Sequence, residues 1–237
     1  MATFASASAA DTQAPLRHLA FKYQLGIQST LEQHSGGINM DSASGIQTSA
    51  MSGSGHDSAG STQADEGTIV ANVIGPTNGG GLLIEISEDG RTHKAGATQV
   101  EVRSDGSLLM PASVQLFDEQ RFALELLGRN IMPISTVVPG ATWKIAMPAG
   151  SGASDEVSFR VVSADDNVAK LSLDRVVKSK AGPGYDVHVT GTVDYDWKRL
   201  VPLNANLYSV LHAQNVQGMT TVQTSIGLAL VEDSFKR

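Results

Sequence analysis

The chain has no cysteine among its 237 residues, which excludes disulfide bonds, thiolate metal ligands and a cysteine nucleophile. Charged residues make up only 17%, the net charge is −7 and the basic residues are scattered, so no electrostatic footprint for nucleic acid or anionic lipid is present. No apolar run approaches the ~20 residues that a membrane-spanning helix needs. The remaining composition, 41% hydrophobic, predicts a folded core.

Short enzyme motifs are missing as well. The sequence has no G-x-S-x-G elbow, no H-E-x-x-H pair and no G-x-G-x-x-G loop. These absences favour a non-enzymatic protein and place a hydrolase third among the interpretations.

The first 15 residues, "MATFASASAADTQAP", have neither hydrophobic periodicity nor anchoring side chains, so we expect a flexible N-terminus. Ala5-Ser6-Ala7 is typical of a signal-peptide cleavage region, but a basic n-region and an apolar core are lacking. Two interpretations stay open: a periplasmic or secreted chain, and a cytoplasmic chain with a flexible start.

Alternation of apolar and polar residues dominates the rest of the chain. From Leu19 to Leu31 the apolar residues fall on odd positions, which predicts one long strand with a single buried face. The same period recurs in later segments, separated by short polar turns that favour antiparallel neighbours. These segments are 68–74, 82–87, 98–103, 156–162, 168–177, 185–197, 201–211 and 222–230.

One segment departs from the period of two. In "FDEQRFALELLGRNIMP" the apolar residues recur about every four positions, Asp118 and Glu119 suit a helix N-terminus, and Gly128 and Pro133 suit its end. We therefore predict one short helix within 117–131.

The stretch from Gly36 to Gly67, "GGINMDSASGIQTSAMSGSGHDSAGSTQADEG", has no periodicity. The strand before it needs partners for its apolar face, and those partners lie beyond the stretch. We therefore predict a long Gly/Ser-rich loop at 36–67 inside a single domain of residues 16–237. The predicted fold class is mainly β: one large curved antiparallel sheet, a half-barrel or open barrel, with one short helix.

Two polar groups deserve comparison with metal or catalytic sites. Asp186, His188, Asp194 and Asp196 share one face of a strand and could supply metal ligands, but no third ligand at diagnostic spacing accompanies an Asp–His pair, and a solvated face explains them. The His56-Asp57 pair lies in the loop, where nothing fixes catalytic geometry. We predict no metal site, no catalytic residue and no cofactor.

In "PGATWKIAMP" a Pro-Gly turn leads into a strand that carries Trp143. The preferred interpretation is an aromatic plug at one end of the concave side, and the alternative is a pocket mouth.

Four stretches together resemble a known group: "LAFKYQLGIQS", "LLGRNIMP", "PGATWKI" and "EVSFRVVSADDNVAKLSLDRV". They resemble exported bacterial β-rich proteins with a Gly-x-x-Trp motif after a proline, matched here by Gly140 and Trp143. More distantly they resemble the LolA-type lipoprotein carriers. The carrier resemblance implies an unclosed barrel that holds a helix and an apolar ligand. The 36–67 insertion and the lack of a cysteine for lipid attachment depart from some members, so membrane anchoring is not implied.

These observations favour a non-enzymatic, exported protein that binds an apolar or lipid-like ligand in a half-barrel. The alternative is a structural or interaction protein with a filled core that assembles through exposed strand faces or edges. We expect no nucleic-acid partner and no transmembrane segment. The predicted pocket lining comprises Phe21, Tyr23, Leu25, Phe122, Leu126, Trp143, Val187 and Leu228.

Overall fold

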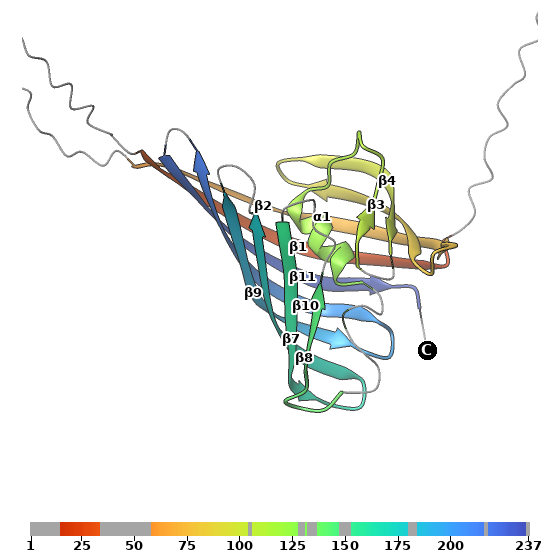
Figure 1. Ribbon diagram of the computed structural model, residues 1–237. Coiled ribbons are helices and arrows are strands. Elements are labelled where there is room, and N and C mark those ends of the chain that lie inside the picture. Colours follow the sequence, from red (N-terminus) through yellow and green to blue (C-terminus); the bar gives the residue numbers. More distant parts are fainter. Residues whose placement is uncertain are drawn as a thin grey trace, which may run out of the picture.

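The computed structural model describes residues 15–33, 58–103, 106–127, 131, 137–146, 153–179, 184–215 and 218–235. Within this part the chain forms one 11-stranded antiparallel sheet and one helix (Figure 1). The elements are β1 (Arg17–Gln33), β2 (Ser58–Pro76), β3 (Leu82–Gly90), β4 (Lys94–Val102), β5 (Leu108–Leu109), α1 (Asp118–Glu125), β6 (Thr142–Ala146), β7 (Ala153–Ala164), β8 (Val168–Ser179), β9 (Tyr185–Asp196), β10 (Val201–Asn215) and β11 (Gly218–Asp233).

The strand order is β5-β4-β3-β2-β1-β11-β10-β9-β8-β7-β6, so nearly every strand pairs with its neighbour in sequence. One long-range pairing joins the two halves, because β1 pairs with β11 over almost its whole length. The sheet is not closed: β5 and β6 are its two edges. The predicted open, curved antiparallel sheet with one short helix is confirmed.

The predicted alternation gives the sheet its buried face. In β1 the odd positions Leu19, Phe21, Tyr23 and Leu25 are buried, whereas Lys22 and Gln24 between them are exposed. The same alternation continues in β2, where the inward positions are odd, and in β3 and β4, where they are even. Every strand therefore contributes one apolar row to a single core cluster on the concave side.

Helix α1 lies in this concavity, between the β3–β4 side and the β7–β8 side of the sheet (Figure 1). Its start is stabilised by the Gln120 side chain, which accepts a hydrogen bond of 3.1 Å from the Phe117 backbone N–H. Ala123 and Leu124 on the helix, with Leu126, Leu127 and Ile131 after it, belong to the core cluster. The helix fills a space that two facing apolar surfaces would otherwise leave open to water.

One boundary of the predicted loop is wrong. Residues 34–57, including His56-Asp57, lie outside the described residues, but Ser58–Gly67 belong to β2 and pair with Tyr23–Glu32 of β1. The polar Ser, Thr and Gln residues of this segment suit a strand whose ladder is formed by backbone hydrogen bonds, which do not depend on side chains. The lack of apolar periodicity there reflects solvent exposure of that end of the strand.

The glycine-rich turns appear where the sequence places them. "GPTNGGG" connects β2 to β3, and Gly80 has a φ of 78°, which favours glycine. Gly140 precedes β6 with a φ of 87°. Among the described residues, no helix has the length and hydropathy to span a membrane.

Candidate functional site

A cluster of buried polar side chains, which we call the His93 cluster, lies on the concave side at the start of α1. Asp65 comes from β2, Glu88 from β3, His93 from the turn between β3 and β4, and Glu119 from the first turn of α1. The three carboxylate side chains are at most 1% exposed, and the His93 side chain is 22% exposed. Four segments thus bring three acids and one imidazole into the core.

His93 lies at the centre of the cluster. Its Nδ1 is 2.9 Å from Asp65 Oδ2, and its Nε2 is 2.8 Å from Glu88 Oε1 and 3.0 Å from Glu119 Oε1. The Phe117 ring packs against the imidazole, with centroids 4.0 Å apart. The imidazole is therefore surrounded by acceptors on both nitrogens.

Asp65 differs from the two glutamates because hydrogen bonds satisfy it. The Thr92 backbone N–H donates to Oδ1 at 2.9 Å, and the Tyr23 hydroxyl donates to Oδ2 at 3.1 Å. Burial opposes ionisation, but hydrogen bonds from Thr92 outweigh it and lower the pKa of Asp65 to about 2. Asp65 is a stable anion in the folded chain.

The two glutamates have less support: Glu119 shares a hydrogen bond of 3.0 Å with His93 Nε2, and Glu88 has none within the described part of the chain. Both carboxylate oxygens of Glu88 are buried without a hydrogen-bond partner among the described residues, since the close approach to His93 does not have hydrogen-bond geometry. Burial raises the pKa of Glu119 to about 7, and the charge of Glu88 adds to the rise. The two glutamates form an electron-rich pair that a cation would stabilise.

Two glycines make room for Tyr23, which carries the cluster's hydroxyl donor. A Cβ on Gly90 would overlap the Tyr23 hydroxyl and lie 2.9 Å from Asp65 Oδ2. A Cβ on Gly67 would lie 2.9 Å from the Tyr23 ring. Glycine at these two positions lets the tyrosine hydroxyl reach the carboxylate.

A second feature is an apolar cavity of about 540 Å³ at the other end of β3, which we call the arginine-lined cavity. Arg17, Arg103 and Arg199 contribute its polar lining. The other lining residues are Leu19, Val73, Pro76, Gly80, Gly81, Leu82, Ile84, Val102, Leu127 and Leu200. Its volume and largely aliphatic wall are typical of small-molecule pockets, which span about 300 to 1,000 Å³.

Two of the arginines are held by carboxylates. Arg17 forms hydrogen bonds of 2.9 and 2.7 Å to the two oxygens of Asp233, and Arg199 donates to Asp196 at 2.7 Å and to Asp233 at 3.0 Å. Although burial opposes it, hydrogen bonds from the arginines lower the pKa of both Asp196 and Asp233. We call these paired arginines and aspartates, together with Arg103, the charged rim of the cavity. Its ion pairs hold the arginines in place and largely cancel their charge, so the aliphatic wall dominates what the cavity can bind.

The eight residues predicted to line a pocket all lie in or against the core, but none of them lines the arginine-lined cavity. Phe122 and Leu126 border a gap of only about 40 Å³ between α1 and β6–β8. Tyr23 and Leu228 border a depression of about 780 Å³ whose other walls are mostly polar. Phe21 and Leu25 belong to the apolar cluster, and Val187 packs against it. Their role in ligand binding stays a prediction.

Trp143 lies on β6 and stacks on Phe159 of β7, with ring centroids 5.5 Å apart. Its indole nitrogen is buried and has no hydrogen-bond partner among the described residues. It also borders a groove of about 690 Å³ on the β6–β9 side. Trp143 is thus half-buried at one edge of the sheet, far in the strand order from the arginine-lined cavity.

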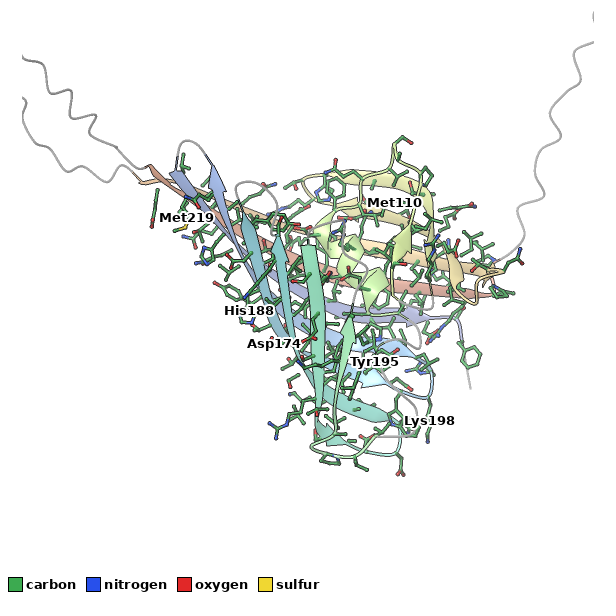
Figure 2. All side chains as sticks on the ribbon, in the orientation of Figure 1. Met110, Asp174, His188, Tyr195, Lys198 and Met219 are labelled. Carbon is green, nitrogen blue, oxygen red and sulfur yellow. The ribbon has the colours of Figure 1, made fainter. Side chains whose placement is uncertain are left out.

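The predicted polar face of β9 is solvated in part, since Asp196 is buried and Asp194 is half-buried. Asp186 and His188 are exposed, and His188 pairs with Asp174 on the neighbouring strand at 3.1 Å (Figure 2). Asp196 instead binds Arg199. Among the described residues, the group whose ligand atoms converge, all within 4.8 Å of one another, is Asp65, Glu88 and His93.

The sequence interpretation missed the His93 cluster, although a signal was present. Glu88 has the same parity as the buried Ile84 and Ile86, and Asp65 has the parity of Ile69 and Ala71. A charged residue in a row of buried apolar residues is a candidate functional residue, because burial of a charge is costly unless something compensates it. Both residues occupy such rows.

Comparison with protein-family models finds no match, and neither does a search of curated proteins. Among solved structures, one described as "lipid-protein interactions in lipovitellin" is similar, with a TM-score of 0.48 and 8% sequence identity. The match covers 95% of this chain and 26% of that chain, so this chain spans about a quarter of the matched one. The similarity is distant and concerns the β-sheet, and the resemblance to LolA-type carriers stays a prediction.

Proposed function

We propose that the protein is a non-enzymatic binding protein that holds an acyl chain, or an apolar molecule of similar shape, in the arginine-lined cavity. The observation that carries the proposal is a cavity of about 540 Å³ with a largely aliphatic wall beside the apolar core. A folded domain normally fills such volume, because an unfilled apolar space loses packing contacts. An apolar ligand recovers those contacts and removes the wall from water.

The rim supports an amphiphile in preference to a pure hydrocarbon. The guanidinium groups of Arg17 and Arg199 are fixed by Asp233, so they present oriented donors at little further entropic cost. Arg103 is exposed on the same cavity. A carboxylate or ester end group would lie on this side, with the chain against Leu19, Ile84 and the other aliphatic residues.

Two adjacent leucines offer a matched test. Leu127 lines the arginine-lined cavity, whereas Leu126 borders the 40 Å³ gap on the other side of the helix end, and both are 3% exposed. Leu127→Trp places the added volume in the cavity and should weaken binding of a fluorescent long-chain fatty acid at least tenfold. Leu126→Trp should leave the affinity within twofold and destabilise the fold by about 1 to 3 kcal/mol through overpacking.

The measurement is a fluorescence titration of the native chain, with octanoate as a short-chain competitor that has the same carboxylate. Saturable binding of one long-chain ligand per chain, lost in Leu127→Trp, supports the proposal. Absence of saturable binding, or equal loss in both variants, contradicts it. The interaction-protein alternative, with the sheet edges β5 and β6 as its surfaces, would then be the hypothesis to pursue.

A further inference from the structure

We propose that the His93 cluster is a binding site for a divalent first-row transition-metal ion, with zinc as the best-fitting representative. The ligands are His93 Nε2 and one carboxylate oxygen each from Glu88 and Glu119. Asp65 acts behind them, on the other ring nitrogen of His93. This site is separate from the arginine-lined cavity and does not depend on its ligand.

The first argument is charge. Asp65, Glu88 and Glu119 bring three carboxylates into the core, and among the described residues His93 is the one basic side chain that pairs with them. The neighbouring Arg91 points to Glu66 on the surface instead. Asp65 is compensated by its hydrogen bonds, which leaves two glutamates against one imidazole. A divalent cation neutralises that pair.

The second argument is the state of Glu88. Its side chain is fully buried, and neither oxygen has a hydrogen-bond partner in the described chain. A buried carboxylate without partners destabilises the folded state, and such groups ordinarily become paired, protonated or metal-bound. Glu88 points at His93 Nε2, at 2.8 Å, so its free lone pairs converge on the proposed metal position.

The third argument is geometry. His93 Nε2 lies 2.8 Å from Glu88 Oε1 and 3.0 Å from Glu119 Oε1. Ligand atoms around tetrahedral zinc, with bonds of about 2.0 to 2.2 Å, are roughly 3.3 Å apart. Each of these two distances therefore needs to lengthen by a few tenths of an ångström for the ion to bind, and the fourth position is left for water.

The fourth argument is the arrangement behind the imidazole. Asp65 Oδ2 lies 2.9 Å from Nδ1, and Asp65 is itself held by Thr92 and Tyr23. A carboxylate at Nδ1 keeps the proton there and leaves the Nε2 lone pair for the metal, which is the usual support of a histidine ligand. Partial exposure of His93 provides the entry path.

Nitrogen and carboxylate ligands together favour zinc or another first-row ion over magnesium and calcium, which prefer oxygen alone. The alternative occupant is a proton on Glu119 shared with His93. A metal titration distinguishes the two occupants. Metal binding saturates at one added ion per chain, whereas binding of a proton does not depend on added metal.

The test uses the full chain with any histidine tag removed, dialysed first against a chelator and then against buffer. Zinc titration by calorimetry should give one ion per chain. At a roughly hundredfold excess over the dissociation constant, the melting temperature should rise by about 5 to 10 °C. Magnesium at the same concentration should leave the melting temperature unchanged.

Three variants and one control assign the ligands. Glu88→Gln and His93→Gln should abolish the zinc-dependent rise, and Asp65→Asn should weaken zinc affinity about 10- to 100-fold while binding persists. His188→Gln, which alters an exposed histidine beside Asp174, is the matched control and should behave as the parent chain. If His93→Gln does not fold, the ligand assignment depends on Glu88→Gln, because that change replaces a buried carboxylate with a neutral amide.

No saturable binding by the parent chain overturns the proposal, and so does a zinc response that survives in Glu88→Gln. Loss of the response in His188→Gln would move the site to the outer face of the sheet, which also contradicts the proposal. Cobalt substitution gives an independent readout: visible absorption bands of four-coordinate Co²⁺ should appear with the parent chain and disappear with Glu88→Gln.

Discussion

Two groups of buried acids lie at opposite ends of the inner face beside α1, and they are compensated differently. At the arginine-lined cavity, Asp196 and Asp233 share two arginines, and their pKa values are lowered. In the His93 cluster, three carboxylates share one imidazole, and burial raises the pKa of Glu119 to about 7. In the first group each acid has an arginine partner, whereas in the second the acids outnumber their one basic partner among the described residues.

The comparison implies that a buried acid destabilises this fold less when it has more hydrogen-bond and ion-pair partners. Val193→Asp should have the largest effect, because it places a carboxylate at a fully buried position in an apolar row of β9. We expect destabilisation of at least about 3 kcal/mol. Urea unfolding followed by circular dichroism measures it.

The neighbouring substitution Thr192→Asp is the control. Thr192 is exposed and faces Ser172 and Asn206 on the adjacent strands, so its effect should stay within ~0.5 kcal/mol. Similar midpoints for the two variants would mean that β9 is buried on both faces.

A third ion-pair group shows the effect of removing the cation. Arg175 binds Asp155 through two hydrogen bonds of 2.8 and 2.6 Å and Glu125 of α1 at 2.8 Å. Arg175→Met removes the arginine partner of two mostly buried carboxylates and should cost about 3 to 5 kcal/mol in urea melts. Lys144→Met breaks an exposed pair with Glu156 and should leave the urea midpoint nearly unchanged. Equal losses of stability in Arg175→Met and Lys144→Met would mean that burial does not decide how much an ion pair contributes.

Carboxylate-to-amide changes sharpen the comparison directly. Asp233→Asn weakens hydrogen bonds to two arginines and should destabilise the chain by about 1.5 to 3 kcal/mol at pH 7. In the presence of chelator, Glu88→Gln replaces a buried carboxylate that has no hydrogen-bond partner among the described residues and should be neutral or stabilising. Thermal melts of both variants in the same buffer provide the test, and a large loss in Glu88→Gln would mean that the free carboxylate is already satisfied.

The smallest effect is a pH slope. Because the pKa values of Asp196 and Asp233 lie below their unfolded value of 3.8, both contribute stability above about pH 4, and that stability is lost as the pH falls further. Each group changes the unfolding free energy by at most about 1.4 kcal/mol per pH unit. Asp233→Asn should therefore show a shallower loss between pH 4 and 2 than the parent chain. An unchanged slope would show that other carboxylates control acid unfolding.

Much of the fold could be read from the sequence because strand periodicity is local. The odd-numbered apolar row of β1, the turn at "GPTNGGG" and the single helix after Phe117 all follow from contacts between residues close in sequence. The start of β2 was missed because Ser58–Gly67 owes its structure to pairing with β1, and its small polar residues show no period.

The candidate sites depended on distant contacts. Asp65 and Glu119 are far apart in the sequence, and their approach to His93 requires the register of β2 on β3 and the position of α1 over both. The position of the arginine-lined cavity likewise depends on Leu127 and Leu200, which follow different elements. The contacts that form the His93 cluster and the arginine-lined cavity therefore leave no pattern among residues that are close in sequence.

The sequence by itself therefore determined the alternating strands, their antiparallel order and the exposed polar face, because parity and short turns are properties of neighbouring residues. Only the tertiary structure decided which inward residues meet. Curvature and long-range register bring Glu88 and Glu119 to the same imidazole, and they leave an aliphatic space beside Arg17, since both outcomes depend on how the sheet wraps around α1.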